Sequence, residues 1–239
     1  MKCGIHQPQF LPWLGYLHKI SSVDVFIFLD NVQFKKNEFQ NRNKIAVNGE
    51  AKWLTVPVSF HFGDALNGTA APDFAQAGRK LVQTLEHSYG KTPFFNAYFE
   101  GLKPLLLRDW DNLAELNQAT VEWLLGCFGI TTRLLTASQL PSFSPERTKR
   151  LVEMCRHVGA DTYFSGVGAK EYLDLSAFEK EGLRVEFQHF EHPVYPQFDK
   201  AGSAGFLSHL SAVDGLFHCG GGAEGRARLN LDSVKKETA

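Results

Sequence analysis

Residues 23–29 form a β-branched and aromatic run that is almost continuously apolar. Strands of this kind are buried on both faces, as they are inside a parallel sheet covered by helices. Residues 2–6 give a shorter apolar segment, and residues 14–22 between the two have the spacing of a short helix. A strand, a helix and a second strand in this order predict a right-handed crossover with parallel strands. The sequence therefore predicts an α/β fold with an open, largely parallel sheet flanked by helices.

The rest of the chain continues this alternation around a helical segment. Helical patterns at 75–88, 94–108 and 111–128 predict an additional helical segment around 75–128, and Ser144-Pro145-Glu146 has the form of a helix start. No composition break divides the chain, so we expect one α/β domain over 1–239, with a loosely ordered tail from about 220 to 239. No strand is predicted in the polar block 33–50. Further strands are predicted at 52–58, 130–136, 162–165 and 183–190.

Composition excludes several functional classes. The chain has 239 residues, of which 25 are Lys or Arg and 26 are Asp or Glu, so its net charge is −1. A generally basic surface for nucleic acid is therefore not expected. The four cysteines are far apart and include no CxxC pair, and no metal site is predicted. Neither a signal peptide nor a membrane span is expected, which predicts a cytoplasmic protein; the oligomeric state is left open.

Polar side chains follow the first two predicted strands. His6 ends the first strand and Asp30 follows the second. Parallel strands place their carboxyl ends at one edge of the sheet, so we predict that His6 and Asp30 share a pocket and are the catalytic residues. In that arrangement the carboxylate would raise the pKa of His6. The alternatives are a core histidine that holds the turn between Pro8 and Pro12, and a carboxylate that only caps a local turn.

Side chains near these strand ends are candidates for substrate binding. Amides and one guanidinium are suited to sugar hydroxyls or to phosphate. The predicted substrate-binding residues in this part of the chain are Gln7, Trp13, Tyr16, Gln33, Gln40, Asn41, Arg42 and Asn43.

A second candidate segment follows the strand at 162–165. Ser165, Gly166 and Tyr172 are predicted to contact substrate, since small residues between a strand and a helix let a phosphate approach backbone N–H groups. The alternative is a tight turn that needs glycine for a positive φ. Both interpretations stay open, and Ser138 and Ser165 are only weak candidates for a nucleophile.

A third segment includes His192 and Tyr195, which are predicted to line the substrate cleft together with Gln197. A metal is not expected here, because strand alternation puts His189 and His192 on opposite faces. Farther along, Ser211 is predicted to cap a helix with Asp214 as its capping partner.

Several motifs together carry a family resemblance. They are His6-Gln7-Pro8, Leu11-Pro12-Trp13-Leu14-Gly15-Tyr16, Leu29-Asp30-Asn31-Val32-Gln33-Phe34, Gln40-Asn41-Arg42-Asn43, Tyr89-Gly90-Lys91-Thr92-Pro93-Phe94, Tyr163-Phe164-Ser165-Gly166 and Leu210-Ser211-Ala212-Val213-Asp214-Gly215-Leu216-Phe217. With them the chain resembles the WbqC-like protein family over almost its whole length. The resemblance implies a place in bacterial O-antigen, capsule or related surface-glycan (lipopolysaccharide, polysaccharide) biosynthesis. The chain departs from the usual pattern at Thr136-Ala137-Ser138 and at His218.

The sequence and the resemblance together favour a transferase. The preferred reaction is acyl or aminoacyl transfer to an amino sugar that is linked to a nucleotide or a lipid, with His6 as base and Asn41 and Arg42 as oxyanion donors. The cofactor or donor would be a nucleotide or an activated acyl compound. One alternative is a nucleotidylyl-transfer-like enzyme, although the His-x-Gly-His pattern is absent and residues 12–16 stand in its place. The other is a non-catalytic sugar-binding subunit of a glycan assembly complex.

Overall fold

The computed structural model describes residues 1–171, 173–197 and 205–232. Its centre is a five-stranded sheet in the order β5-β2-β1-β6-β7, and every neighbouring pair is parallel. The predicted open, parallel α/β sheet is confirmed. The strands are β1 (Lys2–His6), β2 (Val25–Phe28), β5 (Arg133–Thr136), β6 (Thr162–Ser165) and β7 (Arg184–Phe187).

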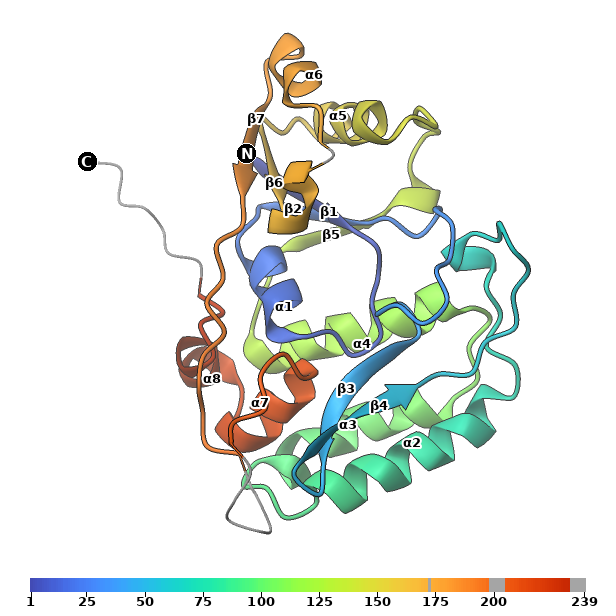
Figure 1. Ribbon diagram of the computed structural model, residues 1–239, viewed down its shortest axis with the longest axis vertical. Helices are drawn as coiled ribbons and strands as arrows, with labels where there is room; N and C mark the ends of the chain where they lie inside the picture. The colour runs from blue at the N-terminus through green and yellow to red at the C-terminus, as the bar shows by residue number, and fades with distance from the viewer. Residues whose placement is uncertain (172, 198–204, 233–239) are drawn as a thin grey trace.

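Alternation along the strands sends side chains into two separate cores. In β2, Val25 and Ile27 belong to one hydrophobic cluster, whereas Phe26 and Phe28 belong to the other. Helices α5 (Arg147–His157) and α6 (Leu175–Lys180) cover the first face, while α1 (Leu14–Ser21), α4 (Leu113–Phe128) and α7 (Ala212–Cys219) lie on the second (Figure 1). Burial on both faces explains why this strand is apolar at consecutive positions.

The strand order reverses beside β1. The chain moves outward from β1 to β2 and then to β5, and afterwards it returns to the other side of β1 to form β6 and β7. Open α/β sheets bind ligands in the crevice outside the carboxyl ends of the strands at such a switch point. In this chain the switch point lies between the carboxyl ends of β1 and β6.

The predicted helical segment is confirmed. It consists of α2 (Phe74–Tyr89), α3 (Phe95–Leu107) and α4. Helix α4 begins where the Asn112 side chain accepts a hydrogen bond from the Glu115 N–H, and it ends at Gly129, whose φ of 64° is the usual left-handed helix stop. Figure 1 shows α2 and α3 packed on the far side of α4 from the sheet, with a β-hairpin lying over them.

That hairpin was only partly predicted. β3 (Arg42–Val47) and β4 (Glu50–Thr55) pair antiparallel in a sheet of their own, so the strand expected at 52–58 lies earlier in the chain and outside the main sheet. The turn between them is Asn48-Gly49, with φ of 53° and 79°. This dipeptide favours a tight hairpin turn because both positions accept positive φ. The polar residues of β3 concealed the strand, since its buried side carries an amide, Asn43, beside Ile45.

The C-terminal part is more ordered than expected. Helix α8 (Gly222–Arg228) forms within the segment predicted to be loose, and Leu229 and Leu231 after it are fully buried. The expectation of a loose segment from about 220 is therefore wrong up to residue 231, because these leucines complete the core below α1 and α4. Short 3₁₀ turns η1 (Leu66–Gly68), η2 (Ala137–Gln139) and η3 (Val167–Glu171) connect the larger elements. Among the described residues, no helix has the length and apolarity needed to cross a membrane.

Candidate functional site

The carboxyl ends of β1, β2 and β6 meet at one edge of the sheet. His6 is paired in register with Phe28, and the Leu29 N–H donates to the His6 carbonyl at 2.8 Å, so Asp30 follows close behind. On the other side of β1 the register ends with Gly4 opposite Phe164, which places Ser165 next along the edge. The strand geometry behind the predicted common edge is therefore confirmed.

The His6 ring is held in one tautomer. Its Nδ1 lies 3.0 Å from the Gln7 carbonyl oxygen, and the ring packs edge-on against Tyr16 with centroids 5.2 Å apart. Because a carbonyl oxygen only accepts, Nδ1 carries the proton and Nε2 is left as an acceptor. Burial of the ring, and then the nearby Lys19 ammonium, lower the pKa of His6 to about 4, against a smaller raising effect of the Gln7 carbonyl. The imidazole is neutral at physiological pH.

Asp30 is committed to other partners. Its Oδ1 accepts from the Ser138 backbone N–H at 2.9 Å, and its Oδ2 accepts from the Ser138 hydroxyl at 2.5 Å and from Asn67 Nδ2 at 3.4 Å. The carboxylate thus joins the loops after β2 and β5. The expected raising of the His6 pKa by Asp30 is wrong, and so is the alternative of a cap for a local turn, because these partners are far away in sequence.

Gln7 and Gln40 connect the first two sequence motifs directly. Gln40 Nε2 donates to Gln7 Oε1 at 2.7 Å, and the Tyr16 hydroxyl donates to the Gln7 carbonyl at 3.1 Å. Gln40 is fixed in turn, because its Oε1 accepts from the Lys35 N–H and its carbonyl accepts from Asn117 Nδ2. These residues brace the loop that follows β1 and orient the backbone next to His6.

The residues after Gln40 point in different directions. Asn41 and Asn43 are buried and donate to the backbone carbonyls of Val56 and Leu11, at 3.1 and 2.8 Å. Arg42 is half-buried, and its guanidinium carbon lies 4.0 Å from the centroid of the Trp53 ring. Asn41 and Arg42 therefore have separate partners and do not form the joint oxyanion site that was expected. Gln33 is exposed, and its backbone forms an isolated bridge with Ala65.

The turn after β6 leaves space in front of the sheet. Ser165 is buried, and its hydroxyl has one long hydrogen bond, 3.4 Å to the Gly166 carbonyl. Neither Gly166 nor Gly168 has a positive φ, and a Cβ at either position would meet no atom within 4 Å. The interpretation that these glycines serve a left-handed turn is wrong, and the space beside their backbone is open. Tyr172 lies outside the described residues.

Trp13, His192 and Tyr195 belong to a second cluster. The Trp13 ring contacts His209 at 5.4 Å between centroids, and the His192 ring contacts both His209 at 5.0 Å and Tyr195 at 6.2 Å. His192 Nδ1 lies 2.8 Å from the Pro193 carbonyl, and Nε2 accepts from the His209 N–H at 3.2 Å. Both ring nitrogens are therefore occupied by backbone groups. Within the described ranges, no three His, Cys, Asp or Glu residues are grouped to hold a metal.

Asp214 is the centre of this second cluster. It is fully buried on α7 and accepts from the hydroxyls of Tyr89 and Tyr195, at 2.9 and 2.8 Å, and from Gln197 Nε2 at 2.9 Å. Burial, and then the Asp214 charge, raise the pKa of both tyrosines, so they stay protonated as donors. Ser211 caps α7 as predicted, but Asp214 is not its capping partner.

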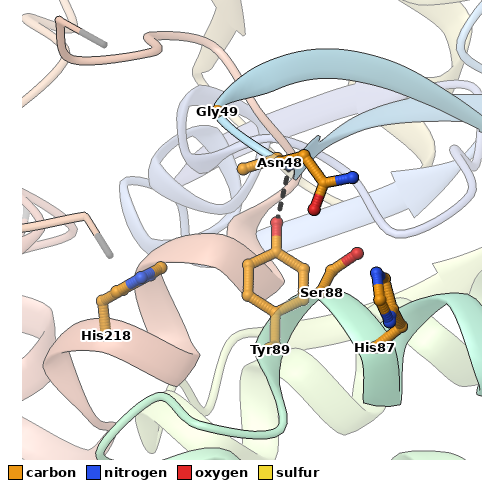
Figure 2. Close-up of a pocket in the computed structure, with 7 residues that line it drawn as sticks. Asn48, Gly49, His87, Ser88, Tyr89 and His218 are labelled. Carbon is orange, nitrogen blue, oxygen red and sulfur yellow. Dashed lines mark hydrogen bonds between the residues drawn. The ribbon is translucent and has the colours of Figure 1, made fainter. Parts of the chain in front are cut away.

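Figure 2 shows a small cavity next to this cluster, between the β3–β4 turn and the end of α2. The Tyr89 hydroxyl points toward the hairpin, where it accepts from the Ala46 N–H at 2.9 Å. The cavity holds about 30 Å³, which is the volume of one water molecule. It is too small for a sugar, and we interpret this cluster as a brace between α7, α2 and the hairpin.

Sequence reasoning missed Lys19. It lies on α1, one turn after Tyr16, with only 3% of its surface exposed. Its ammonium donates to the Ile5 carbonyl at 2.8 Å, one residue before His6. One sequence feature could have indicated this burial. The helix that carries Lys19 forms a short crossover between two buried strands, and such a helix is covered on all its faces.

The fold and this edge define a class of protein: a doubly wound α/β protein whose polar strand ends surround the switch point. The chain belongs to the WbqC-like protein family, whose sequence pattern matches residues 7–224. It is 30% identical over 224 residues to the "Uncharacterized protein Rv1507c" of Mycobacterium tuberculosis, and this alignment covers 92% of the present chain and 94% of that protein. No solved structure is significantly similar to the present chain.

Proposed function

We propose that the chain is a transferase of bacterial surface-glycan biosynthesis that acts on an amino sugar linked to a nucleotide or a lipid. The observation that carries the proposal is the switch point between β1 and β6, where His6 and the open backbone at Gly166 lie on the same edge of the sheet. Sheets of this order bind phosphate-bearing ligands there. The chain's membership of the WbqC-like family supports the proposal, because the name of that family is associated with glycan biosynthesis.

The reaction we propose is acyl or aminoacyl transfer to the sugar amine. The amine would attack the acyl carbonyl to form a C–N bond, and the bond between the acyl carbon and its donor would break. The amine proton would pass to His6 Nε2, the free acceptor of a neutral ring, and from there to the departing donor group. A base with a pKa of about 4 is weak, so His6 contributes more by orienting the amine than by driving its ionisation. Asp30 would act at a distance, since it holds the loops after β2 and β5 around the crevice.

The other candidate residues remain proposals with more specific roles. Gln7 and Gln40 position the loop beside His6, and Ser165 with Gly166 faces the phosphate. The buried Nε of Arg42 has no hydrogen-bond partner in the part of the chain that is described, so Arg42 is proposed as a contact for the distal part of the substrate. Localisation in the cytoplasm and binding of a small molecule belong to the same proposal.

A nucleotidylyl-transfer reaction is the second candidate, and the strand order favours it. In the order of the chain, the five strands lie as 3-2-1-4-5, an arrangement typical of nucleotide-binding sheets. In this reaction the nucleotide phosphates would lie at Gly166, and His6, whose Nδ1 proton is held by the Gln7 carbonyl, would accept a hydrogen bond from the substrate at Nε2 beside them.

Isothermal titration with nucleotide sugars, acyl-coenzyme A compounds and ATP tests these candidates. Binding of both a nucleotide sugar and an acyl donor, with turnover that His6→Gln abolishes, would support the transferase. Binding of ATP without an acyl donor would favour nucleotidylyl transfer, and sugar binding without turnover would indicate a non-catalytic subunit. His61→Gln is the matched control, because the His61 side chain is 94% exposed. A protein that binds none of these ligands would contradict the proposal.

A further inference from the structure

Lys19 has an unusual environment for a lysine. The side chain is almost completely buried, and its Nζ has one hydrogen-bond acceptor among the described residues, the Ile5 carbonyl at 2.8 Å. A lysine ammonium carries three donors. Two N–H groups of a buried cation are therefore available to another acceptor.

Among the residues that the structure describes, no negative side chain balances this charge. Within the described ranges no carboxylate forms an ion pair with Lys19, and the groups that raise its pKa are the thiols of Cys3 and Cys155. Burial lowers the pKa of Lys19 to about 8, which leaves the ammonium mostly protonated at neutral pH. An unpaired buried charge costs free energy unless something compensates it.

The position of this cation coincides with the switch point. Ile5 is the residue of β1 just after the last registered pair with β6, Gly4 opposite Phe164. The Lys19 ammonium also lies near enough to His6 to lower the pKa of its ring. On the opposite strand, Ser165 and the open Gly166 backbone follow at the same level. A buried cation, a neutral imidazole and an uncrowded backbone thus lie at the ends of two neighbouring strands, at the edge where a doubly wound sheet binds its ligand.

We propose that Lys19 is the cation of an oxyanion subsite at the β1–β6 switch point, which binds a phosphate group of the substrate. This inference rests on the proposed function and specifies how that site holds a phosphorylated sugar. One N–H of the ammonium stays on the Ile5 carbonyl and fixes its direction, while the other two donate to phosphate oxygens as charge-assisted hydrogen bonds. The negative charge of the phosphate then compensates the positive charge of the Lys19 ammonium.

The alternative is that Lys19 only fastens α1 to β1. This role also uses the Ile5 carbonyl, but it predicts no dependence on anions. Binding of a bare phosphate compound therefore separates the two roles, because inorganic pyrophosphate offers the charge without a sugar, a base or a lipid.

The experiment measures pyrophosphate affinity at constant ionic strength for wild type, Lys19→Met, Lys19→Gln and Lys80→Met. Met and Gln both remove the charge, so one remains informative if the other does not fold; Lys80 is an exposed control on α2. We expect saturable binding to wild type and Lys80→Met, and at least tenfold weaker binding to the Lys19 variants. Equal affinity in all folded variants, or no binding to wild type, would overturn the subsite.

Hydrogen exchange of the wild-type protein gives a test that needs no variant. Pyrophosphate should slow exchange in α1, at the end of β1 and at residues 165–168. Protection confined to other segments would contradict the placement.

Two further ligands identify the source of the phosphate and separate this inference from the proposed function. Uridine diphosphate represents a nucleotide-linked substrate, and geranyl diphosphate represents a lipid-linked one. Lys19-dependent binding of pyrophosphate without binding of any linked sugar would retain the subsite and reject the transferase. A nucleotide sugar that binds wild type and Lys19→Met equally would reject the Lys19 subsite and leave the proposed transferase in place.

Discussion

At the scale of single residues, the environment of a side chain decides its chemistry. His6 and Asp30 stand at neighbouring strand ends, yet the carboxylate bonds to Ser138 and Asn67 while the imidazole lies beside Lys19. The effect on the His6 pKa is therefore opposite in sign to that of a carboxylate partner. The effects of such environments on stability can be measured on the protein without any substrate.

The first prediction concerns the pH dependence of stability. The folded protein holds His6 neutral down to a pKa of about 4, whereas the unfolded chain binds a proton below its ordinary pKa of 6.5. Because the unfolded state binds more protons in this interval, the free energy of unfolding should fall as the pH is lowered from 6.5 to 4. Urea denaturation across this range should show a smaller decrease for His6→Gln than for wild type. A His61→Gln control should keep the wild-type slope, and identical slopes in all three proteins would contradict the lowered pKa.

The second prediction compares two tyrosines that donate to the same carboxylate. Tyr89→Phe removes a donor to Asp214 and also the acceptor of the Ala46 N–H, whereas Tyr195→Phe removes only a donor. Losing a hydrogen bond to a buried charge costs about 1.5–3 kcal/mol, and a buried N–H left without an acceptor adds about 1 kcal/mol or more. We expect Tyr89→Phe to be the less stable variant by about 1 kcal/mol in chemical denaturation. An equal or reversed order would show that water satisfies Ala46.

At the scale of elements, glycines at different turns serve different purposes. Gly49 has a φ of 79° in the β3–β4 turn, whereas Gly166 and Gly168 after β6 have ordinary backbone angles and open surroundings. The positive φ of the turn requires glycine at position 49, whereas Gly166 and Gly168 leave their backbone accessible.

The third prediction uses this contrast. Gly49→Ala should destabilise the protein by about 1–2 kcal/mol, since a Cβ is strained in the left-handed region. Gly166→Ala should leave the melting temperature close to that of wild type, because its Cβ meets no atom within 4 Å. The same Gly166→Ala variant should bind nucleotide sugars more weakly if phosphate approaches this turn. Gly168→Ala serves as the stability control, and a large loss of stability in Gly166→Ala would show that this glycine has a structural role.

At the scale of the whole molecule, the C-terminal segment completes the core. The Ser21 hydroxyl donates to the Leu231 carbonyl at 2.5 Å, and Leu229 packs beside Gly215 of α7. The last described residues therefore hold α1, the helix that carries Tyr16 and Lys19, against the sheet. The candidate site depends in this way on residues from both ends of the described chain.

The fourth prediction tests that dependence. Leu229→Ala and Leu231→Ala each remove a fully buried side chain, which costs about 2–5 kcal/mol. Leu175→Ala, at a position 45% exposed on α6, is the control and should cost much less. Calorimetric melting temperatures provide the measurement. Leucine variants at 229 and 231 that melt like the control would mean that this segment contributes little to the core.

The sequence by itself determined the class of fold and the edge of the sheet at which the candidate site lies. Apolar runs with the lengths of strands, separated by helical patterns, leave few arrangements other than a parallel sheet covered on both faces, and the ends of β1 and β2 follow from the chain order. The three helices from α2 to α4 were predictable for the same reason, since each has a clear apolar periodicity. The hairpin was less visible because β3 buries an amide, Asn43, although its Asn-Gly turn was a usable signal.

Only the tertiary structure decided which side chains meet. Asp30 and Ser138 are far apart in the chain, as are Asp214 and Tyr89, and nothing local to either residue encodes its partner. The burial of Lys19 was equally hidden, because a lysine on a short helix is normally exposed. Periodicity specifies which face of an element is covered, whereas pairing between distant polar groups depends on how the covered faces are finally packed.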